Sequence, residues 1–324
     1  MAPVSPLPQR HGLDAVRLRT PDTGPWATMR DHLVARLPRV APARIDAMLS
    51  TGAIVGRHGP LDPGAPFVPR EFLWFHRELP DEVPVPFAVD VLHRDDDIVV
   101  VDKPHFLATI PRGRHIVETV LVRLRRELGL PELSPAHRLD RVTAGVLLFV
   151  VRRDRRGAYQ TLFSARRVHK TYEAVAPHDP AVPLPTTVRS RIVKERGVVL
   201  ARELPGPPNA ETRVELLEHR DGAARYRLTP LTGRTHQLRL HMRGLGLPIL
   251  GDRFYGTATG EPEDSALDDW TRPLQLLAAT LEFPDPRTGT TRRFASRRTL
   301  QAFTDPAGWE VGPAPQQVSV SSKE

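Results

Sequence analysis

The chain has 324 residues, with 46 Lys and Arg against 38 Asp and Glu, and it contains no Cys. This length can bury one sizeable core plus a small second module, and the lack of Cys excludes disulfides, thiolate metal ligands and a cysteine nucleophile. The formal charge of +8 favours a polyanionic partner, because phosphates attract Arg and Lys over long distances.

No targeting or membrane segment is visible in the sequence. The first twenty residues are rich in Pro and Arg and lack the apolar stretch of a secretory signal. Apolar runs such as residues 146–151 are far too short to cross a bilayer. We therefore expect a soluble, cytoplasmic protein that does not contact a membrane.

The N-terminal quarter divides into an arm and a small module. Residues 1–25 hold five Pro with little apolar periodicity, which predicts a flexible arm. From Met29 to Leu49 apolar residues recur at helical spacing, and short β-rich runs follow near residues 53–55 and 72–75. We interpret residues 26–80 as an accessory module, followed by a Pro-containing linker.

A second domain is expected over residues 81–305. Two β-rich runs at 89–92 and 98–101 resemble a hairpin, and a helical pattern over 116–128 ends at Gly129. Further helices are expected over 154–165 and 235–243, and further strands over 146–151, 169–176, 187–193, 212–218, 225–229 and 275–283. Strands interrupted by separate helices indicate an α+β fold with a mixed, mostly antiparallel sheet flanked by helices.

Two segments lack the features of a folded element. Residues 257–272 form an acidic, Gly-containing insertion. Residues 306–324 are polar, and we expect a disordered tail there.

Residues 135–150 contain the largest cluster of residues that could act in catalysis or binding. Five polar residues directly precede a strongly apolar strand: His137, Arg138, Asp140, Arg141 and Thr143. Polar groups packed against a buried element are costly unless they pair with one another or with a ligand. A carboxylate flanked by two arginines stays ionised at neutral pH, as a nucleophile or base must. An isolated Arg-Leu-Asp, however, is more often a structural ion pair.

The whole window, His-Arg-Leu-Asp-Arg-x-Thr-x-Gly-x-Leu-Leu, resembles the signature of the RluA family of RNA pseudouridine synthases. The resemblance continues in order along residues 87–300. Further stretches similar to the family's motifs are residues 99–104 (Val-Val-Val-Asp-Lys-Pro), 170–175 (Lys-Thr-Tyr-Glu-Ala-Val), 230–241 (Pro-Leu-Thr-Gly-Arg-Thr-His-Gln-Leu-Arg-Leu-His), 244–256 and 277–283. Ala144 departs from the pattern, which usually has Ser at this position.

This resemblance implies a pseudouridine synthase fold, a structured RNA as partner, and a set of site residues. The catalytic residues would be Asp140, Tyr172 and Arg234, with Arg234 paired to the carboxylate. Residues expected to contact the substrate are His137, Arg138, Arg141, Thr143, His236 and Gln237. The accessory module is loosely similar to a small RNA-binding domain that precedes many of these enzymes.

The reaction requires no cofactor, because the base is detached and rejoined without redox change. We expect no metal either, since His236 and His241 are five residues apart and do not share a helical face. Asp140 could add to the sugar or remove the 2′ proton. Tyr172 could stack on the flipped uracil or take the proton from carbon 5. An arginine run at residues 152–156 could follow phosphates or be a solvated face.

Two other classes of function compete with this interpretation. A non-catalytic RNA-binding protein would not need all three catalytic residues. A carboxylate-based nucleoside or sugar hydrolase would need a second catalytic acid, and none stands out in the motifs. The sequence predicts a monomer that converts uridine to pseudouridine in ribosomal or transfer RNA.

Overall fold

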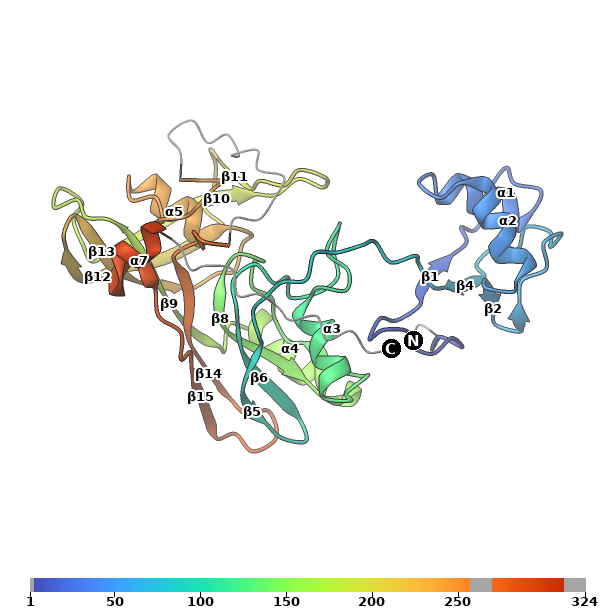
Figure 1. Ribbon diagram of the computed structural model, residues 1–324, viewed down its shortest axis with the longest axis horizontal. Coiled ribbons are helices and arrows are strands. Elements are labelled where there is room, and N and C mark those ends of the chain that lie inside the picture. Colours follow the sequence, from blue (N-terminus) through green and yellow to red (C-terminus); the bar gives the residue numbers. More distant parts are fainter. Residues whose placement is uncertain (1–2, 257–269, 312–324) are drawn as a thin grey trace. The chain divides into compact units, whose positions relative to one another are not determined.

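A computed structural model describes residues 3–256 and 270–311, and the chain divides by its internal contacts into two units (Figure 1). Unit 1 holds residues 1–82 and 125–131, and unit 2 holds residues 83–124 and 132–324. Among the described residues, no helix is both long and apolar enough to cross a membrane. Residues 257–269 of the acidic insertion and the last thirteen residues of the expected tail lie outside the described residues. Within that tail, Pro306–Val311 forms helix α7.

Unit 1 combines a small sheet with two helices. The strand order is β1-β4-β2-β3, and the helices lie between β1 and β2 in the chain. The element bounds are β1 Val16–Arg19, α1 Met29–Arg36, α2 Pro42–Ser50, β2 Val55–Gly56, β3 Gly59–Pro60 and β4 Phe72–Phe75. The core contains Leu33, Ile45 and Leu73, each fully buried.

The helices of unit 1 begin where local chemistry permits. Thr28 accepts a hydrogen bond from the backbone N–H of Asp31, whose carboxylate accepts one from the backbone N–H of Thr28, so a capping box starts α1. Pro42 occupies the first turn of α2, where its missing N–H is not needed. Strand β1 lies inside the segment expected to be a flexible arm, so that expectation is wrong for residues 16–19. Its four residues pair in register with β4, and Leu18 opposite Leu73 is buried.

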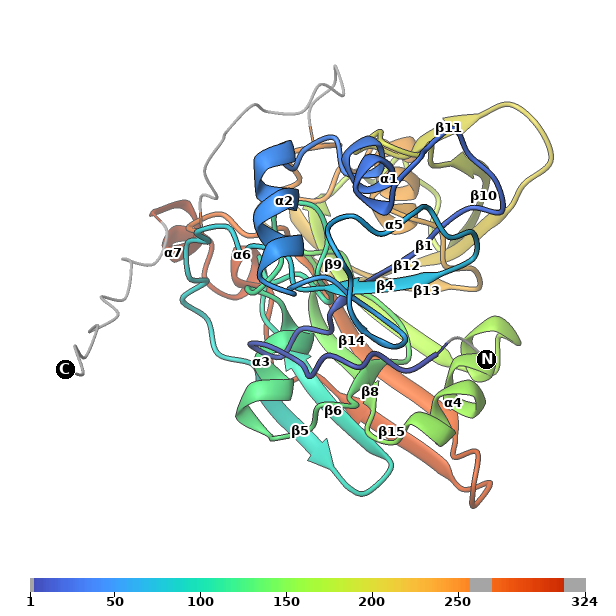
Figure 2. The ribbon, with the colours of Figure 1, turned by 90° about the vertical axis from the view of Figure 1, so that its right-hand side faces the viewer.

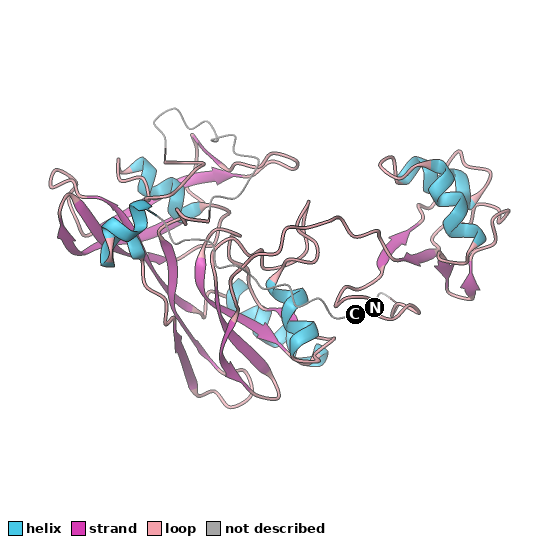
Figure 3. Ribbon diagram, viewed as in Figure 1, coloured by secondary structure: helices cyan, strands magenta, loops and turns pink. Residues whose placement is uncertain are grey.

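Unit 2 is built on one large sheet, as the strands in Figure 3 show. The path is β11-β10-β12-β13-β9-β14-β8-β6-β5, with β15 paired to β14 and β7 paired to β8. The bounds are β5 Asp90–Arg94, β6 Ile98–Lys103, β7 Ser134–Pro135, β8 Ala144–Val150, β9 His169–Pro177, β10 Thr186–Val193, β11 Arg202–Leu204, β12 Ala210–Arg220, β13 Ala223–Pro230, β14 Leu276–Pro284 and β15 Thr291–Ala295.

The pairing confirms the predicted α+β class with a mixed, mostly antiparallel sheet. The β8–β14 pair is parallel, and the other pairs described in unit 2 are antiparallel. Gly145 has φ +112° at this contact, and a side chain there would meet the backbone oxygen of Ala278 at 2.3 Å. Only glycine permits such an approach of β14, seen beside β8 in Figure 2.

Helices cover the sheet of unit 2 at separate places. Tyr159 and Leu162 of α4 pack with residues of β6, β8 and β14, whereas Leu238 and Met242 of α5 pack with residues of β9, β12 and β13. The helix bounds are α3 Val120–Glu127, the 3₁₀ turn η1 Arg153–Arg155, α4 Arg156–Ser164, α5 Gln237–Gly244 and α6 Gln301–Thr304. The start of α5 and the loop before β8 carry the candidate site.

Candidate active site

Asp140 lies in the loop that connects β7 to β8. Its backbone carbonyl accepts a hydrogen bond from the N–H of Thr143 at 3.1 Å, which closes a turn just before the buried strand β8. The side chain remains 34% exposed. A carboxylate is thus presented at the end of a rigid strand, where solvent or a substrate can reach it.

Three side chains at the end of β6 and in the segment after it hold this loop in place. The buried ammonium of Lys103 donates hydrogen bonds to the carbonyls of Pro104, Leu107 and Arg141 at 2.8–3.0 Å. The hydroxyl of Thr109 donates to the carbonyl of Leu139 at 2.9 Å and accepts from its N–H at 3.2 Å.

His105 adds a third contact, since its Nδ1 lies 2.7 Å from the carbonyl of Val142. Burial lowers the pKa of Lys103 well below its usual range, and the charge of Asp140 opposes that shift. Residues 139, 141 and 142 are therefore fixed on both sides of Asp140. Sequence analysis marked residues 99–104 as a motif but missed the function of Lys103, His105 and Thr109.

Arg239, on the first turn of α5, is the arginine nearest to the Asp140 carboxylate among the described residues. Its Nη1 lies 4.0 Å from Oδ2 of Asp140. Its other two nitrogens bind Asp252, Nε to Oδ2 at 2.7 Å and Nη2 to Oδ1 at 2.5 Å. Both side chains of this second pair are buried, and Asp252 also accepts the N–H groups of Phe254 and Tyr255. Asp252 thus orients Arg239 towards Asp140 by a bidentate ion pair.

His236 contributes a second nitrogen to the same carboxylate oxygen. Its Nε2 lies 3.9 Å from Oδ2 of Asp140, and its Nδ1 lies 2.8 Å from the hydroxyl of Tyr255. Burial lowers the pKa of His236, while the negative charge of Asp140 raises it in part. His236 has φ +57° at the N-cap of α5, and this left-handed turn allows its ring to reach both partners.

Tyr172 lies on β9 and belongs to the same site. Burial raises the pKa of its hydroxyl, and the charge of Asp140 raises it further, so the two groups are electrostatic neighbours. The ring packs against the core that contains Leu228 and Leu238. Within the described part of the chain its hydroxyl has no hydrogen-bond partner. The site therefore combines a carboxylate, a cation, an imidazole and a free phenol.

The expected pairing of Arg234 with Asp140 is wrong. Arg234 precedes α5, is exposed, and donates from Nε to the carbonyl of Asn209 at 3.1 Å. Arg234 and Arg239 lie in the same motif. Because α5 begins between them, only Arg239 is on the helix and faces Asp140. Arg239 lies three residues after His236, nearly one helical turn, and takes the position expected of Arg234.

Gln237 is a structural residue, contrary to the expectation that it contacts RNA. Its oxygen accepts from the Thr232 hydroxyl at 2.7 Å and from the N–H of Arg234 at 3.0 Å. Its amide donates to the Glu211 carbonyl and the Thr212 hydroxyl, both at 2.9 Å. All its hydrogen-bonding groups are used, so it stabilises the turn before α5.

The other predicted residues separate into inward and outward groups. Nε2 of His137 accepts from the N–H of Leu148 at 3.1 Å, and its ring stacks on Phe163, so His137 supports β8. Thr143 is also buried. Arg138 is exposed, and Arg141 is half-buried with its Nη1 3.2 Å from the carbonyl of Phe106. In the arginine run at residues 152–156, the charge of Arg152 is paired with that of Asp154 at 2.9 Å.

Sequence analysis also missed Lys170. It lies two residues before Tyr172 on β9, so both side chains point to the same face of the sheet. Its Nζ is 4.0 Å from the position that a side chain on Gly233 would occupy. Burial lowers the pKa of Lys170, and no hydrogen bond or ion pair of its side chain occurs within the described ranges. Its place two residues before Tyr172, in the motif over residues 170–175, could have indicated that Lys170 belongs to the site.

Comparisons with known proteins identify the family. Residues 97–243 match the family model described as RNA pseudouridylate synthase. The "Dual-specificity RNA pseudouridine synthase RluA" of Pasteurella multocida (strain Pm70) is 35% identical over 215 residues, which cover 62% of this chain and 89% of that protein. The protein of the same name from Escherichia coli (strain K12) is 34% identical over 211 residues, covering 63% and 90%.

A solved structure extends the likeness to the fold. "Human RNA Pseudouridylate Synthase Domain Containing 4" superposes with a TM-score of 0.52 at 27% identity, covering 70% of this chain and 95% of that one. The family match, the near-complete coverage of the relatives and the resemblance found in the sequence motifs agree. The chain belongs to the RluA family of RNA pseudouridine synthases, enzymes that isomerise uridine to pseudouridine within RNA.

Proposed function

We propose that Asp140 is the catalytic carboxylate and acts on a uridine flipped out of its RNA. The observation that carries this proposal is the position of Asp140 as the partly exposed end of a buried network. Behind it, Arg239 and His236 direct nitrogens at one of its oxygens. A nearby cation favours the ionised carboxylate, and the free face remains available to the sugar.

The reaction conserves every atom of the nucleotide. The bond between N1 of uracil and carbon 1′ of ribose breaks, the base turns, and carbon 5 bonds to carbon 1′. Carbon 5 then loses its proton, and N1 ends with one. Asp140 either adds to carbon 1′ or removes the 2′ proton, and both routes need the anion that Arg239 stabilises.

Tyr172 completes the site on the side of the base. Its ring offers a stacking surface for the uracil, as flipped bases find in other enzymes. Its hydroxyl is close enough to Asp140 to respond to its charge. If Asp140 becomes an ester or takes a proton, its negative charge disappears and the pKa of Tyr172 falls. We therefore propose that, after the glycosidic bond breaks, the Tyr172 hydroxyl gives its own proton to N1 of the uracil. The resulting phenolate oxygen then takes the carbon 5 proton, which restores the phenol.

The substrate is proposed to be a structured region of ribosomal or transfer RNA. The term "dual-specificity" in the names of the relatives supports more than one RNA target. Arg138, Arg141 and Lys170 carry positive charge around Asp140 and are proposed to contact phosphates. We further propose a monomer acting in the cytoplasm, with a catalytic domain over residues 81–305 and an accessory module over 26–80.

The test maps pseudouridine by chemical labelling in RNA from a strain that lacks this protein. Restoring the wild-type gene should recover specific sites, and restoring Asp140→Asn should not. A non-catalytic RNA-binding protein would change no site. A hydrolase would release free uracil and leave an abasic nucleotide, which mass spectrometry of the RNA distinguishes.

A further inference from the structure

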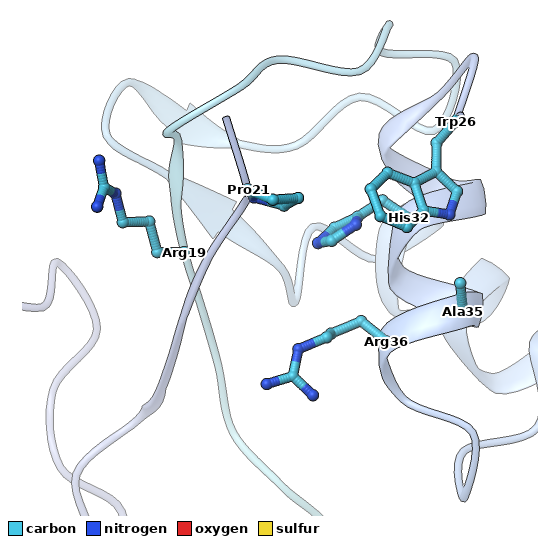
Figure 4. A pocket seen from close by; sticks show the side chains of 6 residues that line it. All are labelled: Arg19, Pro21, Trp26, His32, Ala35 and Arg36. Atoms are coloured by element: carbon cyan, nitrogen blue, oxygen red, sulfur yellow. The ribbon is translucent and has the colours of Figure 1, made fainter. Parts of the chain in front are cut away.

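Unit 1 contains a cavity of about 330 Å³ that the catalytic site does not use. Its lining residues come from the end of β1, the segment that follows it, and helix α1: Arg19, Pro21, Trp26, His32, Ala35 and Arg36. Figure 4 shows the Trp26 indole above His32, with the Arg36 guanidinium below and Arg19 across from them. Pockets of this size accommodate small ligands or single groups of larger ones.

Trp26 supplies a broad aromatic surface at this cavity. Its ring meets His32 edge-on, with centroids 4.5 Å apart, and lies 5.4 Å from the ring of Phe67. Gly24 packs so closely on the indole that a side chain there would come within 2.0 Å of a ring carbon. Gly24 is therefore needed for this position of the indole. The ring is held by its neighbours and is ready to stack without prior ordering.

His32 is an unsatisfied polar group aimed into the cavity. The residue is 1% exposed, and neither ring nitrogen has a hydrogen-bond partner. Burial lowers the pKa of His32, and the charge of Arg36 lowers it further, so the ring is neutral with one donor and one acceptor. Buried polar groups without partners are rare and costly in native proteins. Such a ring lacks the hydrogen bonds that a ligand in the cavity could supply.

The cavity also has two cations without a bound anion. Arg19 and Arg36 are exposed, and within the described residues neither forms an ion pair. The pKa of Asp22 is lowered mainly by its bidentate contact with Arg70 and to a smaller extent by the charge of Arg19. Asp22 therefore already has a partner. The Arg19 guanidinium lies over the Phe72 ring, 5.8 Å from its centroid. Two exposed arginines that line the same cavity as an indole match the phosphates and base of a nucleotide.

We propose that this cavity binds one unstacked nucleotide of single-stranded RNA. The base stacks on Trp26 and hydrogen-bonds His32, while Arg36 and Arg19 contact the adjoining phosphates. The inference rests on the RNA substrate of the family and extends the proposed accessory module, but it does not depend on the function of Asp140. It assigns a base-reading site to unit 1, in addition to phosphate contact.

Nuclear magnetic resonance of the full-length protein tests the site directly. The indole N–H signal that disappears in Trp26→Phe identifies Trp26. The probe is an unstructured eight-nucleotide RNA containing uridine and adenosine, added to saturation, with the same backbone lacking bases as control. We expect the Trp26 signal to shift with the RNA and not with the abasic strand. An unmoved signal, or equal shifts with both strands, would overturn the proposal.

Matched variants then separate stacking from general charge. Trp26→Ala should weaken binding of the octamer about tenfold, within the range for one stacked base. Arg36→Gln should weaken it several-fold, whereas Arg39→Gln, an exposed arginine three residues further and outside the cavity, should have little effect. Equal losses for the two arginine variants would reduce the site to nonspecific attraction and contradict the proposal.

A third variant uses the unsatisfied imidazole. His32→Phe removes two buried nitrogens that lack partners, so it should raise the thermal midpoint of the free protein while it lowers RNA affinity. Unchanged affinity in this variant would exclude His32 from the site. Asp140→Asn should bind the octamer as the wild type does, so failure of the catalytic proposal leaves this result intact.

Discussion

Arg239 contacts two aspartates at once, binding Asp252 through Nε and Nη2 and directing Nη1 to Asp140 at 4.0 Å. Asp252 is buried and exposes no oxygen to the substrate side, so its function is to orient the guanidinium. Asp140 is the more exposed of the two acids. The arrangement aims a fixed positive charge at a carboxylate that remains accessible.

The first prediction compares the two arginines of the same motif. Arg239→Lys keeps a charge but loses the fork that binds Asp252, so kcat/KM should fall by about a hundredfold or more. Arg234→Ala should change it by about twofold at most, because Arg234 is exposed and contacts a carbonyl of Asn209. The measurement is pseudouridine formation on a stem-loop RNA. A larger loss in Arg234→Ala than in Arg239→Lys would contradict the geometry.

The second prediction concerns the hydroxyl of Tyr172. Tyr172→Phe retains the stacking ring, so RNA affinity should stay near the wild-type value. Turnover should fall by about a hundredfold, as expected for loss of a proton-transfer group. Tyr172→Ala should lose affinity as well. Full turnover in Tyr172→Phe would leave stacking as the function of this residue.

The third prediction tests the hydrogen bonds that hold the loop of Asp140. Thr109→Val preserves shape but leaves the N–H and carbonyl of Leu139 without partners, which should cost about 1–3 kcal/mol of stability. We expect kcat to fall more than RNA affinity, because Asp140 loses its position. Thr161→Val on α4, where the exposed hydroxyl contacts the carbonyl of Gly157, is the control. Equal effects of the two variants on kcat would show that Thr109 does not position the loop.

The fourth prediction is loss of stability in mild acid. Burial lowers the pKa of His137 to about 3 and those of His105 and His241 to about 4. Unfolding restores values near 6.5, so below that pH the unfolded chain binds more protons than the folded one. Stability should be fully present above pH 6.5 and decline towards pH 4.

Urea unfolding at pH 7.5 and pH 5.5 measures this decline. Each of the three histidines should contribute on the order of 1 kcal/mol to the difference. His137→Met should reduce the difference, since it removes one titrating group. A midpoint that does not change between the two pH values would contradict the assignment of these rings as buried and neutral.

Much of the fold was predictable because its strands are short apolar or alternating runs. The sequence pattern predicted β6, β9 and β10 nearly to the residue, and its helical spacing predicted α5. Strands β1, β11 and β15 were missed. Each has at most five residues, which is too short for a clear alternating pattern. Strand β1 pairs with the distant β4, whereas β11 and β15 pair with the preceding strands β10 and β14.

The candidate site was predictable in its motifs and less so in its geometry. Asp140 and Tyr172 were predicted because they occupy the corresponding positions of the family's motifs, and the structure brings them together. The choice between Arg234 and Arg239 required knowing where α5 begins and which face is buried. His137 and Gln237 have polar side chains that satisfy backbone groups, and nothing in a motif separates that use from binding of RNA.

The most direct test of the central claim is pseudouridine formation by purified Asp140→Asn on a structured RNA that the wild type modifies. The amide preserves the shape of the side chain and removes the charge that Arg239 and His236 face. The account predicts a variant that is folded, binds the RNA with wild-type affinity and forms no pseudouridine. Substantial turnover by that variant would contradict the assignment of Asp140 as the catalytic carboxylate.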